Sequence, residues 1–329
     1  MTSTWKDGLL TAGAAVGMAG LGTLAYSRWI ERLRIEVKRM RVVVDSPAVP
    51  SQGLRILHLS DLHFTDHGLI ERLKIRRTQE LLADETYDLL LITGDLIHDD
   101  EGLPATLSFI DGLPEPRLGA FACLGNHDYA GYSWFGPAHV AWREAEPGQE
   151  LQAAIERTVE MCVRIVKNDR LYLGHVRNDV PLLKQKLEMH GVHVLDNDSL
   201  TIQSDGVELW LAGLDDLMEG QPDVEQITKA MPGNGTLRIL LAHNPDYMLD
   251  PALQAFDLAF SGHVHGGQVR LPFIGSPHTQ GTHLSRRLSS GWFRYGKTKT
   301  YISRGLGEGV RLRFNCRPEV ALIEVVPAR

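Results

Sequence analysis

Five short motifs along this chain contain side chains that bind metal ions, and each motif follows a run of apolar, β-prone residues. The motifs are HLSDLH, LLLITGDL, CLGNHD, LLAHNP and SGHVHGG, in that order. Carboxylate, imidazole and amide groups without thiolates favour Mn²⁺, Fe or Zn²⁺ in a catalytic site over a closed structural zinc site. Seven residues carry these groups: Asp61, His63, Asp95, Asn126, His243, His263 and His265. We therefore predict a site for two divalent metal ions, with Mn²⁺ as the first candidate.

A pair of divalent ions suits the chemistry of phosphoesters. Such a substrate is anionic, so a nucleophile must approach like charge, and charge must be stabilised on the leaving oxygen. Two ions about 3.5 to 4 Å apart bind the phosphoryl oxygens and lower the pKa of a water molecule. One histidine alone is more often structural than catalytic, but seven candidate ligands in order along one chain favour a phosphohydrolase.

The ends of predicted strands must bring these ligands together. Residues 54–59, 87–93 and 118–124 are apolar runs followed directly by the first three motifs. Residues 70–85 have the apolar spacing of an amphipathic helix. This order is typical of βαβ units, in which the carboxyl ends of parallel strands lie at one edge of a sheet.

A second series of strands is expected in the other half of the chain. The runs are 194–202, 207–212, 237–242, 256–260, 300–303 and 320–325. We predict an α/β fold over residues 53–329 in which two sheets pack together with helices outside, a four-layer α-β-β-α sandwich. That arrangement places both sets of strand ends at one edge.

The motifs taken together resemble those of the calcineurin-like metallophosphoesterase superfamily. Its pattern D-x-H, G-D, G-N-H-D/E, H and G-H-x-H is met in order between residues 54 and 268. The resemblance implies one metal held by Asp61, His63, Asp95 and His265, and another held by Asp95, Asn126, His243 and His263. It also implies that His127 stabilises or protonates the phosphoryl group. Asp128 is expected to orient the His127 imidazole.

The first 52 residues are interpreted as an anchor and a linker. Residues 8–26 contain no charged side chain and are just long enough to cross a bilayer as a helix. The basic residues that follow favour a catalytic domain on the cytoplasmic side of the inner membrane. We therefore expect a membrane anchor over residues 1–27 and a basic juxtamembrane linker over 28–52. A cleaved signal peptide and a surface-lying or disordered segment are the alternatives.

Residues 130–186 interrupt the alternation of strands and ligand motifs. They contain aromatic residues, among them Trp134 and Phe135, and a predicted helix over 150–166. An insertion directly after the GNHD motif lies beside the metals, so we expect a substrate lid in which Trp134 and Phe135 contact substrate. The alternative is a helical hairpin that only buries its own aromatic side chains.

The carboxyl-terminal residues are similar to those of a membrane-anchored bacterial branch of the superfamily. In that branch the stretch corresponding to residues 304–307 lies near the site, which makes Arg304 a candidate phosphate contact. A structural ion pair is the alternative role of Arg304. Asp215 and Asp216 also end a predicted strand and are weaker candidates for contacts around the site.

Composition limits the partners. The formal net charge of −7 leaves no basic face for a nucleic-acid backbone, so no nucleic-acid partner is expected. Three widely spaced cysteines argue against a disulfide framework.

Some enzymes of the branch hydrolyse UDP-2,3-diacylglucosamine in lipid A assembly, so the resemblance implies a phosphorylated lipid substrate at the membrane. A phosphodiesterase or phosphatase for soluble nucleotides or phosphoproteins is the alternative, followed by a binding protein without catalysis. The sequence predicts no oligomeric state.

Overall fold

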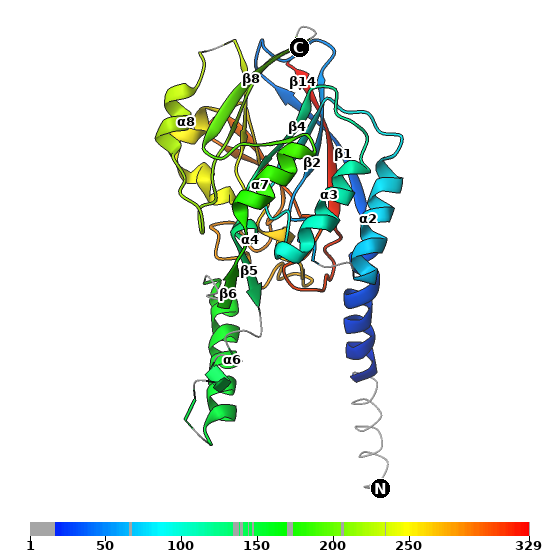
Figure 1. Cartoon of the computed structure of the whole chain (residues 1–329), viewed down its shortest axis with the longest axis vertical. Coiled ribbons are helices and arrows are strands. Elements are labelled where there is room, and N and C mark those ends of the chain that lie inside the picture. The colour runs from blue at the N-terminus through cyan, green and yellow to red at the C-terminus, as the bar shows by residue number, and fades with distance from the viewer. Residues whose placement is uncertain are drawn as a thin grey trace.

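A computed structural model describes most of the chain. The described residues are 17–65, 68–133, 138, 141–143, 145–146, 148–169, 174–204, 207–233 and 235–328. The predicted mixed α/β fold is confirmed, with two six-stranded sheets and a small two-stranded ribbon (Figure 1).

The first sheet contains the strands that lead to the first three motifs. Its order is β1 (Glu36–Val44), β14 (Glu319–Pro327), β2 (Leu54–Leu59), β3 (Leu89–Thr93), β4 (Gly119–Cys123) and β7 (Val192–Val194). Strands β2, β3, β4 and β7 are parallel to one another, while β14 runs antiparallel to β2. Strand β3 is buried along its whole length, which explains its unbroken apolar sequence.

The second sheet holds the strands before the last two motifs. Its order is β12 (Gly291–Tyr295), β13 (Thr298–Ile302), β11 (Leu258–Ser261), β10 (Leu237–Leu241), β9 (Val207–Gly213) and β8 (Asp198–Ser204). The four central strands are parallel, and the two outer strands are antiparallel to their neighbours. Parallel strands end at a common edge, so β10 and β11 deliver their motifs side by side.

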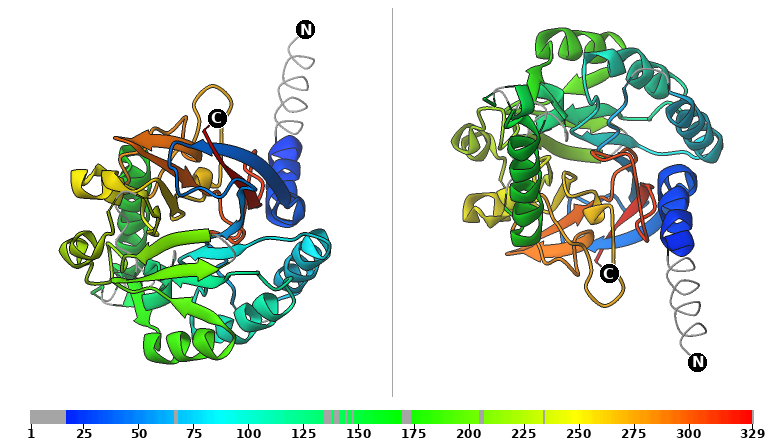
Figure 2. Two further views of the ribbon diagram at one scale, coloured as in Figure 1. Left: turned by 90° about the horizontal axis from the view of Figure 1, so that it is seen from above. Right: turned by 90° about the horizontal axis from the view of Figure 1, so that it is seen from below.

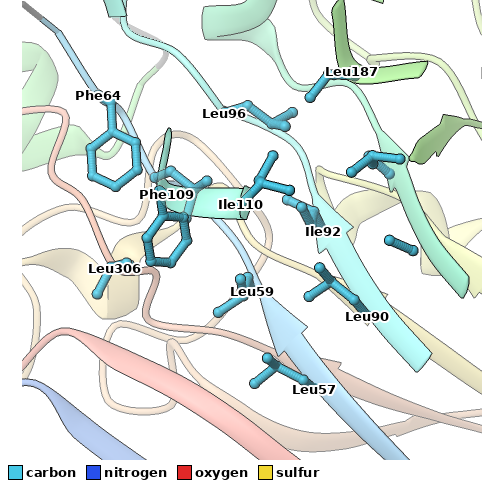
Figure 3. Close-up of a cluster of buried hydrophobic side chains, with 14 of the residues drawn as sticks. Leu57, Leu59, Phe64, Leu90, Ile92, Leu96, Phe109, Ile110, Leu187 and Leu306 are labelled. Carbon is cyan, nitrogen blue, oxygen red and sulfur yellow. The ribbon is translucent and has the colours of Figure 1, made fainter. Parts of the chain in front are cut away.

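Three main hydrophobic cores separate the layers. One lies between the two sheets and contains residues from both, such as Leu91 in β3 and Ile239 in β10. A second packs α2 (Leu69–Leu82), α3 (Leu103–Asp111) and α7 (Val180–Met189) onto the outer face of the first sheet (Figure 3). The third packs α8 (Val224–Ala230), η4 (Pro245–Leu249) and η5 (Pro251–Ala255) onto the second sheet. Helices therefore cover both outer faces, as Figures 1 and 2 show.

The interpretation of residues 28–52 as a linker is wrong for much of that range. Residues 36–44 form β1, which pairs in parallel with β14 over its full length. The basic residues of this segment belong to an edge strand: Arg39 pairs with Glu85, and Arg41 with Glu324. Charged side chains are common on edge strands because they discourage pairing with other chains. The folded domain thus begins before Gly53.

The start of the described chain is helical. Residues 17–25 form a helix that continues into η1 (Tyr26–Ile30) and η2 (Glu31–Leu33). Within the described part of the chain, no helix is both long and apolar enough to cross a membrane. Much of the expected anchor, residues 1–16, lies outside the described residues.

The insertion contains a ribbon and a long helix. Strands β5 (Ala130–Ser133) and β6 (Gly174–Arg177) pair antiparallel, and α6 (Glu150–Lys167) lies between them in sequence. The helix predicted over 150–166 is therefore present. Trp134 and Phe135, the expected substrate contacts, lie outside the described residues.

Candidate metal centre

Loops at the carboxyl ends of five strands carry the seven predicted ligands. Asp61 and His63 follow β2, and Asp95 follows β3. Asn126 begins the short helix α4 (Asn126–Tyr129) after β4. The remaining ligands follow β10 and β11 in the second sheet: His243, His263 and His265, the last at the start of η6 (His265–Gly267). The two sheets therefore present their motifs to a common site, and all seven side chains belong to buried residues.

One group of donors surrounds His63. Its Nε2 atom lies 3.1 Å from Asp95 Oδ2 and 3.0 Å from His265 Nε2. His265 Nε2 lies in turn 3.5 Å from Asp61 Oδ1. The donor atoms of these four residues all lie within 4.8 Å of one another, so one ion can contact all of them.

A second group surrounds His243 and again includes Asp95. His243 Nε2 lies 3.3 Å from the same Asp95 Oδ2 atom that faces His63. His263 Nδ1 lies 3.1 Å from Asn126 Oδ1 and 3.3 Å from His243 Nε2. The structure thus brings the seven residues together in two groups that share Asp95, which is the partition implied by the resemblance. Their role as ligands stays a prediction.

Charge at the site favours cations. Burial by itself raises the pKa of Asp95, but His243, His127 and His63 lower it well below its usual range. Burial lowers the pKa of His243, yet the neighbouring Asp95 carboxylate, followed by Asp61 and Asp216, raises it to about 10. The buried carboxylates therefore stabilise positive charge beside them, and the donor set fits divalent ions.

Backbone hydrogen bonds fix the orientation of the donors. The backbone N–H of His127 donates to Asp95 Oδ1 (2.8 Å), and the N–H of His263 donates to Asp61 Oδ1 (2.9 Å). His243 Nδ1 lies 2.8 Å from the carbonyl oxygen of Thr93, which leaves Nε2 directed toward Asp95. A second hydrogen bond of this kind sets the tautomer of a metal-binding histidine.

Five of the seven predicted ligands have positive φ angles. The values are 51° for Asp61, 46° for His63, 53° for Asp95, 69° for His263 and 53° for His265. Residues other than glycine adopt this left-handed region at a cost of about 1 to 3 kcal/mol each, and such residues concentrate at functional sites. The surrounding fold therefore holds the loops in conformations that serve the site rather than the local backbone.

Glycines in the motifs make room for the carboxylates. A Cβ atom on Gly125 would lie 2.4 Å from Asp95 Oδ1, and one on Gly262 would lie 2.4 Å from Asp61 Oδ2. Neither contact can be relieved by moving a flexible side chain, because both carboxylates are buried and hydrogen-bonded. The G in the GNHD and GHVH motifs is thus required by close packing.

His127 lies beside the first group and is not one of its donors. Its ring packs against the His63 ring with centroids 4.3 Å apart, and against Tyr132 at 4.7 Å. Burial, followed by the charge of His63, lowers the pKa of His127 well below its ordinary value. Burial therefore favours the neutral imidazole, which carries one N–H that can donate a hydrogen bond.

The expected role of Asp128 is corrected by its contacts. Among the described residues, its carboxylate accepts hydrogen bonds from the backbone N–H groups of Leu96, Ile97 and Gly125, at 2.8, 3.1 and 2.8 Å. None of these hydrogen bonds comes from the His127 ring. Burial raises the pKa of Asp128 to about 7. Asp128 instead joins the loop after β3 to the loop after β4, so its influence on the site is through backbone position.

Arg304 is also corrected. Its Nε atom lies 2.5 Å from Glu319 Oε2, and its terminal nitrogen lies 2.8 Å from Glu36 Oε2. The second role considered from the sequence, a structural ion pair, is the one that the structure shows. Arg304 joins β1 and β14 to the loop after β13. Its guanidinium is engaged by two carboxylates and does not serve as a phosphate contact.

Asp215 and Asp216 stabilise a turn beside the site. Asp215 accepts a hydrogen bond from the Tyr129 hydroxyl, and Asp216 accepts from the backbone N–H groups of Met218 and Glu219. Burial raises the pKa of Asp216 to about 6. Asp215 thus connects α4 with the loop after β9, and Asp216 stabilises the turn that follows.

His98 is a site residue that sequence reasoning missed. Its ring lies 4.9 Å from the His127 ring and 5.8 Å from the His63 ring, and the three histidines have donor atoms within 4.8 Å of one another. Burial, then the charge of His63, lowers its pKa to about 4. The only signal in the sequence was its position three residues after Asp95, which none of the five motifs includes.

A buried charged cluster connects the chain start to the site. Glu308 Oε1 lies 2.6 Å from Lys74 Nζ and 3.2 Å from Arg313 Nε, while Glu308 Oε2 lies 2.9 Å from Arg32 Nε. The loop that carries Glu308 donates backbone hydrogen bonds from residues 306 and 307 to the carbonyl oxygens of residues 60 and 61. Arg32, which was expected in a linker, therefore helps to position the loop of a predicted ligand.

A groove of about 950 Å³ lies next to the metal centre. Its walls come from the ribbon of the insertion, the loop after β3 and the carboxyl-terminal loop. The residues that border it include His98, Tyr132, Val176, Arg28, Arg177 and Arg311. Arg28 donates to the Arg311 carbonyl (2.7 Å), and Arg177 pairs with Glu219 (2.8 Å). The Arg311 side chain forms no ion pair with any residue in the described part of the chain.

Comparison with known proteins agrees with this geometry. Residues 54–267 match the calcineurin-like phosphoesterase family. The chain is 29% identical to an uncharacterized metallophosphoesterase of Bacillus subtilis, over 96% of this chain and 93% of that protein. It is 28% identical to a phosphodiesterase of Escherichia coli, over 96% of each chain.

A third relative is named for a specific substrate. The chain is 29% identical to the UDP-2,3-diacylglucosamine pyrophosphatase of Chlamydia trachomatis, over 92% of each chain. The family match covers more than half of the chain and includes all five motifs. The protein belongs to the calcineurin-like phosphoesterase family and is a metal-dependent phosphoester hydrolase.

Proposed function

We propose that the protein uses two divalent metal ions to hydrolyse a phosphodiester or pyrophosphate bond in a membrane lipid. The substrate we favour is UDP-2,3-diacylglucosamine, cleaved to lipid X and UMP. The observation that carries the two-ion proposal is the position of Asp95 Oδ2, which lies 3.1 Å from His63 Nε2 and 3.3 Å from His243 Nε2. One carboxylate oxygen thus serves both donor groups.

Each group of side chains has a role in this reaction. Asp61, His63, Asp95 and His265 would hold one ion, and Asp95, Asn126, His243 and His263 the other, with Mn²⁺ favoured and Fe or Zn²⁺ as alternatives. When bound, the ions supply positive charge for the phosphoryl oxygens and increase the acidity of water. The His127 imidazole donates a hydrogen bond to the phosphoryl or leaving oxygen. His98 and Tyr132 pack around His127 and limit the orientations of its ring.

The groove supports a substrate with both anionic and apolar parts. Arg311 borders the groove together with His98 and also borders a smaller cavity together with His63. We assign Arg311 the phosphate contact that Arg304 cannot make, because its guanidinium forms no ion pair with a described residue and borders a cavity shared with His63. Val176, which is 77% exposed, and Leu312 add apolar surface to the same groove. This combination favours a phosphorylated lipid over a phosphoprotein.

We place the protein at the inner membrane with its site on the cytoplasmic side. The support is the uncharged stretch over residues 8–26 and the basic residues after it. The Chlamydia relative, named for a diacylated nucleotide sugar, adds a reason for a site near lipid.

Turnover of three substrates on one preparation tests the proposal. The full-length protein is stripped of metal, reloaded with Mn²⁺, and assayed with UDP-2,3-diacylglucosamine, bis-p-nitrophenyl phosphate and p-nitrophenyl phosphate. We expect metal-dependent hydrolysis of the first two, with kcat/KM highest for the lipid, and release of UMP. Preference for the monoester would overturn the lipid proposal.

Metal content is measured in the same experiment. Two ions per chain by elemental analysis would support the shared role of Asp95, and one ion would overturn it. Strong activity on the diester without activity on the lipid would favour a phosphodiesterase for soluble substrates, as the name of the Escherichia coli relative suggests. Binding of metal without hydrolysis of any ester would contradict catalysis altogether.

A further inference from the structure

Helix α6 has little packing against the rest of the described chain, unlike α2, α3 and α7. None of its residues is buried, although it has 18 residues. Its carboxyl end is attached to the body: Asn168 Oδ1 accepts from the Thr279 N–H (2.7 Å), and Asn168 Nδ2 donates to the Thr282 carbonyl (3.2 Å). From there the helix extends away from the sheets toward its amino end (Figure 1).

One face of α6 is a continuous apolar stripe. Leu151, Ile155, Val159 and Val163 recur at intervals of four residues, and Val166 extends the stripe to the last turn; all five are exposed. The other face carries the ion pairs of Glu160 with Arg157 and Arg164. An amphipathic helix owes its stability mainly to packing of its apolar face, and α6 has no such packing within the described chain. The described residues therefore leave the stripe uncovered.

The helix over residues 17–30 has a second exposed apolar surface at the same end of the molecule. Met18, Leu21 and Leu24 are exposed on it, and Trp29 and Ile30 follow. Figure 1 shows this helix and α6 extending beyond the sheets in the same direction, toward the end that carries α4, β5 and β6. That end is the one at which the strands deliver the predicted metal ligands.

A loop with exposed apolar residues lies between the attachments of the two helices. Phe273 is 96% exposed, and Ile274 and Leu271 beside it are also exposed. On one side of this loop the Arg270 N–H donates to the Phe314 carbonyl (2.8 Å), and the N–H of residue 313 donates to the carbonyl of residue 27 (3.0 Å). On its other side are the two threonines that hold the end of α6. The segment over residues 268–286 thus connects the bases of both projecting helices.

Exposed cations accompany all three apolar elements. Arg34 follows the first helix, Lys167 ends α6, and Arg287 adjoins the exposed Leu288. Arg311 borders the groove at the same end. Apolar residues bordered by Lys and Arg are typical of surfaces that lie at the headgroup level of anionic bilayers.

We propose that the α6 stripe, the loop around Phe273 and the exposed side of residues 17–30 form one docking surface for an anionic lipid bilayer. We call it the docking surface. A bilayer is broad and nearly flat, so it can contact three separated elements at once, whereas a partner helix or a second copy of α6 would cover the stripe alone. Docking in this orientation turns the metal-ligand loops and the groove toward the lipid headgroups. The inference concerns membrane contact and does not depend on which phosphoester is cleaved.

The native cysteines provide a probe for this proposal. Cys162 is exposed and lies within the α6 stripe, whereas Cys123 and Cys316 are buried. The full-length, metal-loaded protein is labelled at Cys162 with an environment-sensitive fluorophore and reconstituted into vesicles of phosphatidylglycerol and phosphatidylethanolamine in a ratio of about 1:3. We expect emission to shift to the blue, quenching by lipids spin-labelled near the headgroup, and quenching by aqueous iodide to fall at least about threefold.

A matched label controls for the vesicles themselves. Met189 is exposed and ends α7 just before β7 begins, so it lies at the edge of the sheet where the parallel strands start, opposite the metal-ligand loops. In a Cys162→Ser, Met189→Cys variant, the label should remain equally accessible to iodide with and without vesicles. Equal accessibility of the Cys162 label with and without vesicles would overturn the proposal, even if a transmembrane segment holds the protein in the vesicle. Shielding of Cys162 before lipid is added, together with a dimer by light scattering, would also overturn it in favour of a second copy.

Paired substitutions separate docking from catalysis. Ile155→Glu with Val159→Glu should restore iodide quenching of the Cys162 label in vesicles while leaving hydrolysis of soluble bis-p-nitrophenyl phosphate within about twofold, because both side chains lie on the α6 stripe. Leu81→Glu with Met189→Glu places the same changes on exposed apolar residues at the far edge and should leave the label shielded. If both pairs have the same effect on shielding, the docking surface is not where we place it. If the metal-loaded parent protein did not hydrolyse the diester at all, the result would contradict the proposed function and leave the docking surface untouched.

Discussion

The metal centre and helix α6 differ in how firmly the rest of the described chain holds them. At the centre, buried polar side chains with positive φ angles are held by hydrogen bonds from several loops. Along α6, apolar side chains are exposed, and among the described residues only those at its carboxyl end attach it to the body. Many contacts within the fold hold the metal centre, whereas α6 depends on contacts outside the described chain. Substitutions should therefore have large, local effects at the centre and partner-dependent effects on α6.

The largest effect is expected from Asp95→Asn, because Asp95 is shared by both donor groups. Loss of its charge should remove metal and lower kcat by more than the roughly 10²- to 10⁴-fold that one acid–base group contributes. Elemental analysis and diester hydrolysis measure both effects. Asp198→Asn, at an exposed carboxylate that accepts from the neighbouring Ser199 N–H, is the control and should change neither. Full metal content in Asp95→Asn would contradict the shared role.

His127→Ala tests whether a residue beside the donors acts on the substrate. We expect kcat to fall by about 10²- to 10³-fold, which is typical of losing one hydrogen-bond donor to a developing charge. Metal content should remain unchanged because His127 belongs to neither donor group. His193→Ala, at an exposed histidine in β7, serves as the control. A parallel loss of metal would mean that His127 is a ligand instead.

Glu308→Gln tests how firmly the fold holds the centre. Removing one partner of a buried ion pair should lower the free energy of unfolding by about 3 to 5 kcal/mol. Glu80→Gln, in an exposed pair with Arg76, should cost about 1 kcal/mol or less. Urea unfolding at neutral pH compares the two. Equal small losses would show that the buried cluster is not what positions the loop.

The pH dependence of stability isolates the same cluster. Burial by itself raises the pKa of Glu308, but Lys74, Arg32 and Arg313 lower it from 4.5 to about 2. Because the folded-state pKa lies below the unfolded value, the contribution of Glu308 is complete above a pH of about 4.5 and is lost as the pH falls toward about 2. The stability difference between the parent and Glu308→Gln should therefore shrink over that interval. A difference that stays constant from a pH of about 5 to about 2.5 would contradict it.

The smallest effect is expected from Arg311→Ala at the rim of the groove. Loss of a partly solvated phosphate contact should raise KM by about tenfold, or roughly 1.4 kcal/mol, with little change in kcat. Arg317→Ala, at another exposed arginine of the same tail, is the control. A drop in kcat at constant KM would mean that Arg311 acts on the transition state alone.

The sequence was sufficient for features that depend on local pattern. Apolar runs of the right length identified β2, β3, β4, β10 and β11, and the ligand motifs followed directly after them. Helical periodicity identified α2, and the helix expected over residues 150–166 corresponds to α6. Such patterns can be read from the chain because a strand or helix repeats its burial every few residues.

Contacts between distant segments could not be read in this way. The basic residues between 28 and 41 suggested a linker, but residues 36–44 pair with β14, almost at the other end of the chain, and form an edge strand. Arg304 had two open roles, and only the positions of Glu36 and Glu319 decided between them. His98 belongs to none of the five motifs. It lies at the site because the loop after β3 turns back beside His127.

The sequence thus determined the chemistry of this protein. The tertiary structure determined which side chains hold the site in position. Ligand types and their order after strands were enough for the family, the hydrolytic class and the requirement for divalent metals. Whether a given charge positions a loop, pairs across a sheet or faces a groove depends on which remote group lies opposite it. Burial makes that choice decisive, because a charge removed from water must find its partner within the fold.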